Sequence, residues 1–140
     1  MDARRGDSGF EEIEHIGDRA LHVWAPDWGE FLKRAAEGLY RILGIDLAAG
    51  PRQTRELTLG AVDAEGLLIL FLNELIFLAD YETLGFDTID IEAGETQLKA
   101  RLGGATIRTR RHDVKAATYG NLAVVRNELG LLEATILFDV

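Results

Sequence analysis

Hydrophobic and polar residues alternate along this chain with two periods, one typical of β-strands and the other typical of α-helices. The period of two is clearest at residues 19–25 and 131–138, near the two ends of the chain. The same pattern predicts shorter strands at residues 10–14, 54–60, 89–93, 98–102 and 105–109, and a strand pair or one long bent strand within residues 114–125. The segments at residues 10–14 and 105–109 show the pattern least clearly, and without them the chain is expected to form about six or seven strands.

A helical period begins after Pro26, which ends the preceding strand. Asp27 and Glu30 stand three residues apart, the spacing of a capping box at the start of a helix. From there, residues 31–43 place their apolar side chains on one face and their charged side chains on the other. Gly44 stands where a glycine commonly ends a helix. The pattern predicts an amphipathic helix that packs on the core with one face.

The longest apolar stretch runs from Asp63 to Asp80 and is interrupted only at Asn73 and Glu74. A helix that is apolar nearly all round has to be buried in a bilayer, against a partner or in its own core. A bilayer span needs about 20 apolar residues, more than this stretch provides. We therefore expect Asp63 to cap a core helix that is covered by a sheet, with the first helix alongside.

Glycine and polar residues mark the predicted turns. Gly94-Glu95 is typical of a tight hairpin, because strand alternation resumes directly after it. We also expect turns at Leu84-Gly85, at Gly103-Gly104 and at residues 127–130. Together these elements predict a layered domain of mixed α and β structure.

Composition supports one packed domain. The chain has 140 residues, of which 47% are hydrophobic. Residues 1–9 show no apolar period and are expected to form a flexible tail, which leaves residues 10–140 as the domain. No segment is typical of a signal peptide or membrane anchor. The absence of cysteine excludes disulfides, thiolate nucleophiles and zinc ribbons, and it fits a cytoplasmic protein.

The formal net charge of −9 disfavours nucleic acid as a partner and favours a cation or a basic protein surface. One basic cluster runs against this balance: Lys99, Arg101, Arg108, Arg110 and Arg111. It could contact phosphates or an acidic partner, or it could be a solvated face that balances acidic residues. Aromatic residues do not interleave with these cations as base stacking would require, so we expect direct RNA binding to be weak or absent.

A second cluster depends on the chain ends meeting. His15 and Asp18 lie near the N-terminus, and Asp139 lies beside the terminal carboxylate of Val140. If the first and last strands pair, the aspartates repel each other. The repulsion is about 4 kcal/mol at a separation of about 4 Å and an effective dielectric constant of about 20. A divalent cation removes that cost, and oxygen ligands favour calcium or magnesium. Alternatively, Asp18 caps a turn and Asp139 is solvated.

Catalytic motifs are weak. Nucleophilic catalysis needs a nucleophile, a base and an orienting group in one cleft. The only serine is Ser8 in the tail, His22 is expected on a strand face, and His112 lies in a charged loop. Two alternatives therefore stay open: a metal-dependent phosphoester hydrolase with His15 as base, and a metal-free scaffolding or chaperone-like module.

Five stretches, taken in order, resemble the archease family: Glu14–Asp18 (EHIGD), Ala35–Gly38 (AAEG), Leu72–Phe77 (LNELIF), Lys115–Tyr119 (KAATY) and Phe138–Val140 (FDV). The resemblance implies an α+β fold: a single compact domain with a mostly antiparallel sheet packed with two main helices. It also implies a non-enzymatic protein cofactor of an RtcB-type RNA ligase that acts in tRNA splicing and RNA repair. Such a cofactor promotes guanylylation and multiple turnover of the ligase, which itself uses the GTP.

The family's metal site corresponds here to Asp18, Asp139 and the terminal Val140, with calcium expected and magnesium or manganese as alternatives. Side chains that could support this site are His15, Lys115 and Thr118. The chain differs from the family pattern at Ile16-Gly17 and at Gly120. The chemistry does not require Asn73 or Glu74 at the metal, so we expect these two side chains to bind backbone or loop groups.

Overall fold

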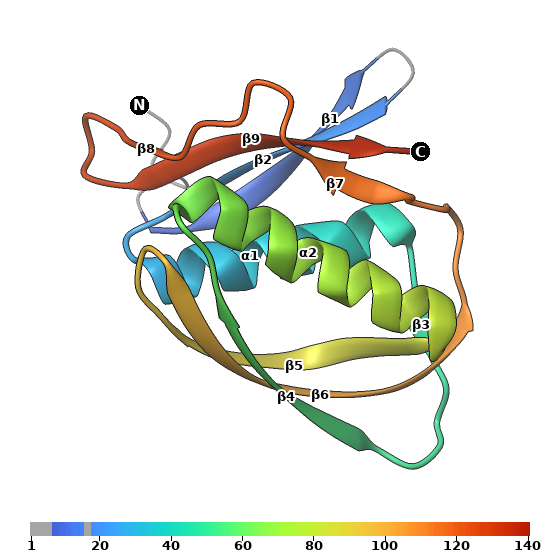
Figure 1. Cartoon of the computed structure of the whole chain (residues 1–140). Coiled ribbons are helices and arrows are strands. Elements are labelled where there is room, and N and C mark those ends of the chain that lie inside the picture. The colour runs from blue at the N-terminus through green and yellow to red at the C-terminus, as the bar shows by residue number, and fades with distance from the viewer. Residues whose placement is uncertain (1–6, 16–17) are drawn as a thin grey trace.

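The computed structural model of the chain describes residues 7–15 and 18–140. Within these ranges the chain forms two helices and nine strands (Figure 1). The helices are α1 (Trp28–Leu43) and α2 (Ala64–Tyr81). The strands are β1 (Gly9–His15), β2 (Asp18–Ala25), β3 (Asp46–Leu47), β4 (Gln53–Gly60), β5 (Leu84–Ala93), β6 (Gln97–Thr109), β7 (Ala116–Thr118), β8 (Val125–Arg126) and β9 (Leu132–Asp139).

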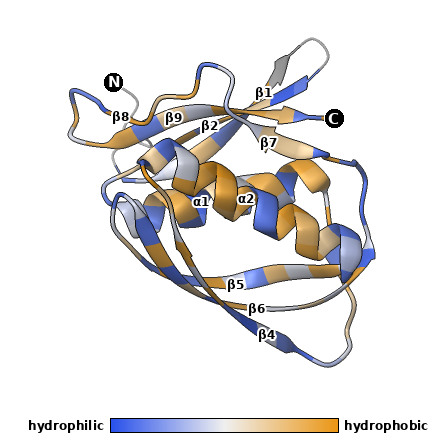
Figure 2. Ribbon diagram, viewed as in Figure 1, coloured by the Kyte–Doolittle hydropathy of each residue, from blue (hydrophilic) through white to orange (hydrophobic). Residues whose placement is uncertain are grey.

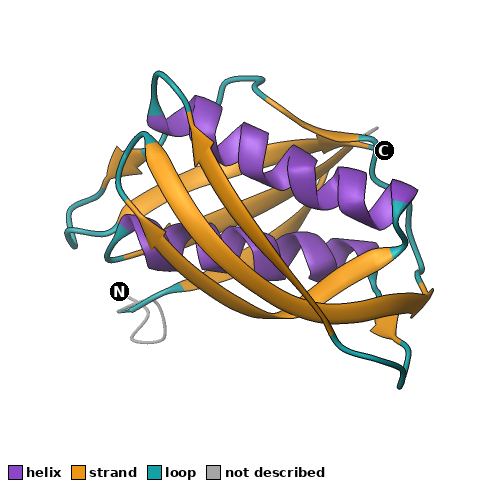
Figure 3. Ribbon diagram, turned by 60° about the horizontal axis from the view of Figure 1, so that its bottom comes forward, coloured by secondary structure: helices purple, strands orange, loops and turns teal. Residues whose placement is uncertain are grey.

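The strands form two antiparallel sheets that enclose both helices (Figure 1, Figure 3). The first sheet has the order β1-β2-β9-β7, and β8 also pairs with β9. The second sheet has the order β3-β6-β4, and β5 also pairs with β6. The predicted α+β class is confirmed. The strands divide between two sheets rather than one, and the short strands β3, β7 and β8 raise their number above the expected six or seven.

Helix α1 begins and ends where its capping residues predict. The side chain of Asp27 accepts a hydrogen bond of 2.8 Å from the backbone N–H of Glu30. Gly44 adopts the left-handed conformation with a φ of 62°, and its N–H bonds the carbonyl of Tyr40. The apolar face of α1 is buried and its charged face is turned outward, so the predicted amphipathic helix is confirmed.

Helix α2 is the apolar core helix (Figure 2). The side chain of Asp63 caps it by accepting a hydrogen bond of 2.7 Å from the N–H of Gly66. The prediction that a sheet covers this helix is wrong for three side chains on one side of it. Leu70, Phe77 and Tyr81, called here the α2 patch, are 42%, 48% and 77% exposed. They recur seven and four residues apart, so they share one side of the helix that neither sheet reaches. Within the described chain, neither helix has the length and apolarity that a membrane crossing requires.

Two predicted turns are wrong, because Leu84-Gly85 lies inside β5 and Gly103-Gly104 lies inside β6. These glycines let two backbones approach closely. A Cβ added to Gly104 would lie only 1.8 Å from the carbonyl oxygen of Gly85. A β-bulge between Phe86 and Thr88 distorts the register at the same place.

The other predicted turns are confirmed. The N–H of Gly94 donates to the carbonyl of Gln97 at 3.0 Å in the β5–β6 hairpin. The side chain of Asn127 accepts hydrogen bonds from two backbone N–H groups in the turn before β9. Residues 114–125 contain β7 and the start of β8, two short strands that both pair with β9. The C-terminal strand therefore organises the first sheet.

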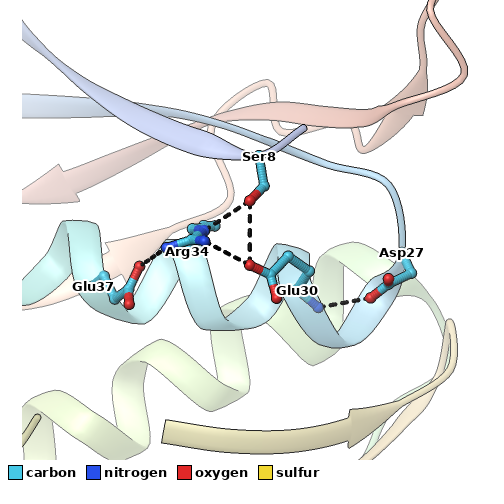
Figure 4. Close-up of polar contacts among 5 residues, drawn as sticks. All are labelled: Ser8, Asp27, Glu30, Arg34 and Glu37. Carbon is cyan, nitrogen blue, oxygen red and sulfur yellow. Dashed lines mark hydrogen bonds and ion pairs between the residues drawn. The ribbon is translucent and has the colours of Figure 1, made fainter. Parts of the chain in front are cut away.

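The first described residues of the chain lie against the first sheet and helix α1. Strand β1 begins at Gly9, one residue before the predicted domain. The hydroxyl of Ser8 donates to Glu30 at 3.2 Å and accepts from Arg34 at 2.9 Å, so this residue contacts the outer face of α1 (Figure 4). Residues 1–6 of the predicted tail lie outside the described residues.

Candidate carboxylate site

The chain ends pair in the first sheet, which is the condition on which the predicted cluster depends. Asp18, the first residue of β2, pairs in register with Asp139, the last residue of β9. Side chains of directly opposed residues in an antiparallel pair lie on the same face, with Cβ atoms about 4.5–5.5 Å apart. Two carboxylates are therefore neighbours at one end of the sheet.

The alternation of β9 determines which face carries Asp139. The side chains of Leu132, Ala134, Ile136 and Phe138 are buried against the helices. Glu133, Thr135, Leu137 and Asp139 therefore point to the outer face. Because a shift of one residue would exchange the two faces, burial of the apolar set fixes the register that opposes the two aspartates.

The other predicted members of the site lie at the same end of the sheet. Val140 directly follows Asp139, and the C-terminus lies beside β7 (Figure 1). His15 pairs in register with Asp18, but its side chain lies outside the described part of the structure. Residues 16 and 17, which connect the two strands, also lie outside the described residues.

Strand β7 flanks β9 on the side away from β2. The backbone N–H of Lys115 donates to the backbone carbonyl of Asp139 at 2.8 Å. The Thr118 hydroxyl donates to the carbonyl of Leu137 at 3.3 Å. Lys115 and Thr118 therefore bond the backbone of β9 beside Asp139. In the described structure the ammonium of Lys115 forms no ion pair.

Asn73 attaches β7 to the core helix. Its side-chain amide donates to the carbonyl of Ala117 at 3.3 Å and accepts from the N–H of Ala117 at 2.8 Å. The predicted role of Asn73 is thus confirmed. The same prediction is wrong for Glu74, which makes no hydrogen bond to a described residue. Glu65 instead accepts from the N–H of Val124 at 2.8 Å.

The donors at this end fit a hard divalent cation by their chemistry, since all are carboxylate oxygens. The described residues contain no cluster of three or more His, Cys, Asp or Glu side chains that could hold a metal. The site would therefore depend on the two aspartates together with Val140. Such a set is small, and it leaves coordination positions for water or a partner.

The predicted basic cluster is largely neutralised. Arg101 pairs with Glu56 at 3.6 Å, Arg108 pairs with Asp46, and Arg110 pairs with Asp80 at 3.0 Å and Asp113 at 3.2 Å. Lys99 lies opposite Glu92 in the register of β5 and β6. Of the predicted set, Arg111 forms no ion pair with a described residue and lies elsewhere, against Gly44. The cluster does not form a continuous cationic surface.

The two histidines whose side chains are described do not form a catalytic group with Ser8. His22 lies on the outer face of β2, where Nδ1 is 3.1 Å from the Thr135 hydroxyl and Nε2 is 3.3 Å from Glu133. His112 is exposed beyond β6, and Ser8 is bonded to α1. Among the described side chains, the predicted donors at the end of the first sheet are carboxylates.

Comparison with known proteins decides the family. The model of the Archease protein family (MTH1598/TM1083) matches residues 10–140. The chain belongs to the archease family. The predicted resemblance is thus confirmed over the whole of the predicted domain.

Individual archeases support this assignment. Protein archease of Thermococcus kodakarensis is 28% identical over 123 residues, which cover 82% of this chain and 87% of that protein. Protein archease of Methanosarcina acetivorans is 27% identical over 141 residues, with coverage of 94% and 95%.

Solved archease structures share the fold. The Thermotoga maritima archease, described as a possible chaperone, superposes with a TM-score of 0.70 at 22% identity, covering 93% of this chain and 96% of its own. Protein 1598 of Methanobacterium thermoautotrophicum gives a TM-score of 0.66 at 22% identity, with coverage of 94% and 99%. At this identity the likeness establishes the archease fold alone.

Proposed function

We propose that this archease-family protein activates an RtcB-type RNA ligase in tRNA splicing and RNA repair, and that it does so as a protein cofactor rather than as an enzyme. In this role it promotes guanylylation of the ligase and allows multiple turnover, while GTP and the catalytic metal belong to the ligase. Family membership supports the proposal. The observation that carries it is the register that sets Asp18 directly opposite Asp139.

Asp18, Asp139 and the terminal carboxylate of Val140 would hold a divalent cation, with calcium first and magnesium or manganese as alternatives. When bound, the cation supplies positive charge that offsets the repulsion between the two aspartates. The hydrogen bonds from β7 hold the backbone of Asp139, and Asn73 in turn holds β7. The core helix α2 thus orients Asp139 through the short strand β7.

The test is multiple-turnover RNA ligation by a cognate ligase with GTP, with and without the protein. We expect Asp18→Asn and Asp139→Asn each to abolish the stimulation. Asp90→Asn is the matched control, because Asp90 is also an exposed strand aspartate but lies on the second sheet. The amount of ligase–GMP adduct should fall in parallel with turnover. An unchanged turnover number on addition of the wild-type protein would refute the proposal.

A fold measurement separates a functional loss from a structural one. Both aspartates lie at strand ends outside the hydrophobic core, so the Asn variants should keep the wild-type circular dichroism spectrum. Variants that lose stimulation while they stay folded support a functional role. Variants that unfold show that the aspartates stabilise the sheet, and that result contradicts the proposed site.

The α2 patch favours a second candidate, a metal-free module that binds exposed apolar segments of other proteins. Its side chains are Leu70, Phe77 and Tyr81, and the Phe77 and Tyr81 rings lie 4.7 Å apart. The relative from Thermotoga maritima is described as a possible chaperone. This candidate predicts that the protein suppresses aggregation of a heated client enzyme, and that Phe77→Ser removes the effect while Asp139→Asn does not.

A further inference from the structure

We propose that a cleft beside the C-terminal half of α1 binds a small organic anion that carries an aromatic ring. This α1 cleft has a volume of about 890 Å³, within the range of pockets that hold small ligands. It lies between α1, β3 and β5, and its lining also includes Phe10 of β1 and Arg111 beyond β6. It is distinct from the carboxylate site, and the inference does not depend on the proposed function.

The walls of the cleft suit the ring of such a ligand. Tyr40 from α1 and Phe86 from β5 are buried, and Phe10 from β1 is half-buried. Ile45 and Ile89 add aliphatic surface to the lining. The surface that the lining exposes is about as polar as it is apolar. Apolar contacts combined with converging polar groups are the usual composition of a small-molecule site.

The acidic side chains of the lining are already bound to arginines that lie outside it. The three pairs are Glu37 with Arg34 at 2.7 Å (Figure 4), Asp46 with Arg108, and Asp87 with Arg52 at 2.6 Å. The hydrogen bond from Arg52 outweighs the opposing effect of burial and lowers the pKa of Asp87. These carboxylates are therefore neutralised locally, and they oppose an anionic ligand only weakly.

The two cations of the lining, by contrast, form no ion pair with any described residue. The guanidinium of Arg41 lies 5.6 Å from the centroid of the Phe10 ring. The stem of Arg111 packs against Gly44, where an added Cβ would lie 3.0 Å from it. The backbone N–H of Arg111 donates to the carbonyl of Leu43, which fixes the chain at this point. Guanidinium groups bind carboxylate, phosphate or sulfonate through paired hydrogen bonds, so these two arginines favour an oxyanion.

A simpler explanation is that both cations only complement the negative end of the α1 dipole. The dipole accounts for their position near the last turn of the helix. It does not account for their place in the lining of an aromatic cleft in which the acidic groups are neutralised from outside. The combination of neutralised carboxylates, available guanidiniums and aromatic walls points to a ligand.

Tyr40 supplies a further donor. Its hydroxyl is buried, and it makes no hydrogen bond of ordinary geometry within the described structure. Burial raises the pKa of Tyr40, and the nearby backbone of Phe86 opposes this only in part. The phenol therefore keeps its proton at neutral pH and can donate it to an oxyanion. Arg41, Arg111 and Tyr40 would hold the oxyanion while the ring of the ligand packs against the walls.

The fluorescent anion anilinonaphthalene sulfonate is the probe for this site, titrated into the whole protein. We expect saturable binding to the folded chain, and a dissociation constant raised about tenfold or more in the Arg41→Gln/Arg111→Gln double variant. Arg101→Gln is the control for each single substitution, since it removes one guanidinium from the second sheet, and it should bind as the wild type does. Loss of the signal in Phe77→Ser would assign the binding to the α2 patch and overturn the proposal.

Competition identifies the part of the ligand that is recognised. Phenyl phosphate and benzoate should displace the probe, and their relative strength shows which oxyanion is preferred. Benzyl alcohol has a similar ring without the charge and should not compete at the same concentration. If it displaces the probe equally well, the site recognises only apolar surface and the proposal is wrong.

The double variant requires a control for folding. Circular dichroism establishes whether the double variant folds. If it does not, the single Arg111→Gln and Tyr40→Phe variants replace it, because each removes one donor with little change in volume. Both should weaken binding of the probe and of phenyl phosphate. Unchanged affinities in these two variants would refute the assigned donors.

Discussion

The second sheet and the end of the first sheet arrange charged residues on their outer faces in opposite ways. In the second sheet Arg101 of β6 lies between Glu56 of β4 and Asp90 of β5, so each acidic residue faces a basic one across the strands. At the end of the first sheet, Asp18 of β2 faces Asp139 of β9. The second sheet thus alternates charge from strand to strand at this position, and the end of the first sheet places like charges together.

Opposite charges across strands stabilise the fold, whereas like charges placed together favour the binding of a cation. Opposite charges across strands contribute roughly 0.2–1 kcal/mol, whereas directly opposed like charges are destabilising. The buried face of β9 fixes the register of the first sheet, so the aspartates cannot move apart by a shift of the strand. Apposed carboxylates are useful when a cation binds between them. The second sheet therefore serves the fold, and the end of the first sheet is where we expect the function.

The largest expected effect breaks the second sheet itself. In Gly104→Ala the added Cβ would lie 1.8 Å from the backbone oxygen of Gly85, and neither backbone can move without separating β5 from β6. We expect the free energy of unfolding, measured by urea denaturation, to fall by about 3 kcal/mol or more.

Gly50→Ala is the control for this variant, because nothing lies within 4 Å of its added Cβ. Its stability should stay close to that of the wild type. Equal stability of the two variants would show that the close approach of β5 and β6 is not required.

The same glycines show where prediction from sequence fails. Glycine serves tight turns and also close backbone contacts, and only the pairing of distant strands distinguishes the two uses. Gly85, Gly103 and Gly104 were therefore predicted as turns although they lie inside strands. The caps of α1 at Asp27 and Gly44 were predicted correctly, because their signals are local.

The arrangement of the first sheet was predictable only in part. The alternation of β9 places Asp139 on the outer face, but it does not establish which strands pair, so the position of Asp18 opposite Asp139 could not be predicted from it. A polar residue within an apolar helix indicated that Asn73 binds a backbone, but its partner Ala117 lies 44 residues away and could not be named. The α1 cleft was not predicted, because several separate segments form its lining.

A second prediction concerns the response to metal. At a calcium concentration 100 times the dissociation constant, the wild-type protein should gain about 2.7 kcal/mol of stability, measured as a shift in thermal unfolding. Asp139→Asn should lose this gain. Without metal the same variant should be slightly more stable than the wild type, because one of two opposed like charges is removed.

The opposite signs with and without calcium distinguish this site from an ordinary charged surface. Asp90→Asn is the control, since Asp90 lies opposite Arg101 in the second sheet. It should keep the calcium response and should not gain stability in the absence of metal. A calcium response that persists in Asp139→Asn would place the cation elsewhere.

A third prediction converts the second sheet to the pattern of the first. Arg101→Glu would set three carboxylates side by side, at Glu56, position 101 and Asp90. We expect a loss of about 1 kcal/mol in urea denaturation at low salt, and a smaller loss at high salt because these side chains are exposed. Arg101→Gln should cost less, since it removes the attraction without adding repulsion. Equal losses in the two variants would contradict the comparison.

The smallest expected effect concerns Asp87, which accepts hydrogen bonds from Arg52. The hydrogen bond from Arg52 lowers the pKa of Asp87 below its ordinary value of 3.8, although burial opposes this shift. The pair therefore stabilises the fold above that ordinary value, and the contribution is lost as the pH falls through the lower pKa of the folded state. Because both side chains are more than half exposed, the gain in stability is small. In Arg52→Gln the pKa of Asp87, followed by NMR titration of its carboxyl carbon, should rise toward 3.8. A pKa that stays low in this variant would show that the arginine does not cause the shift.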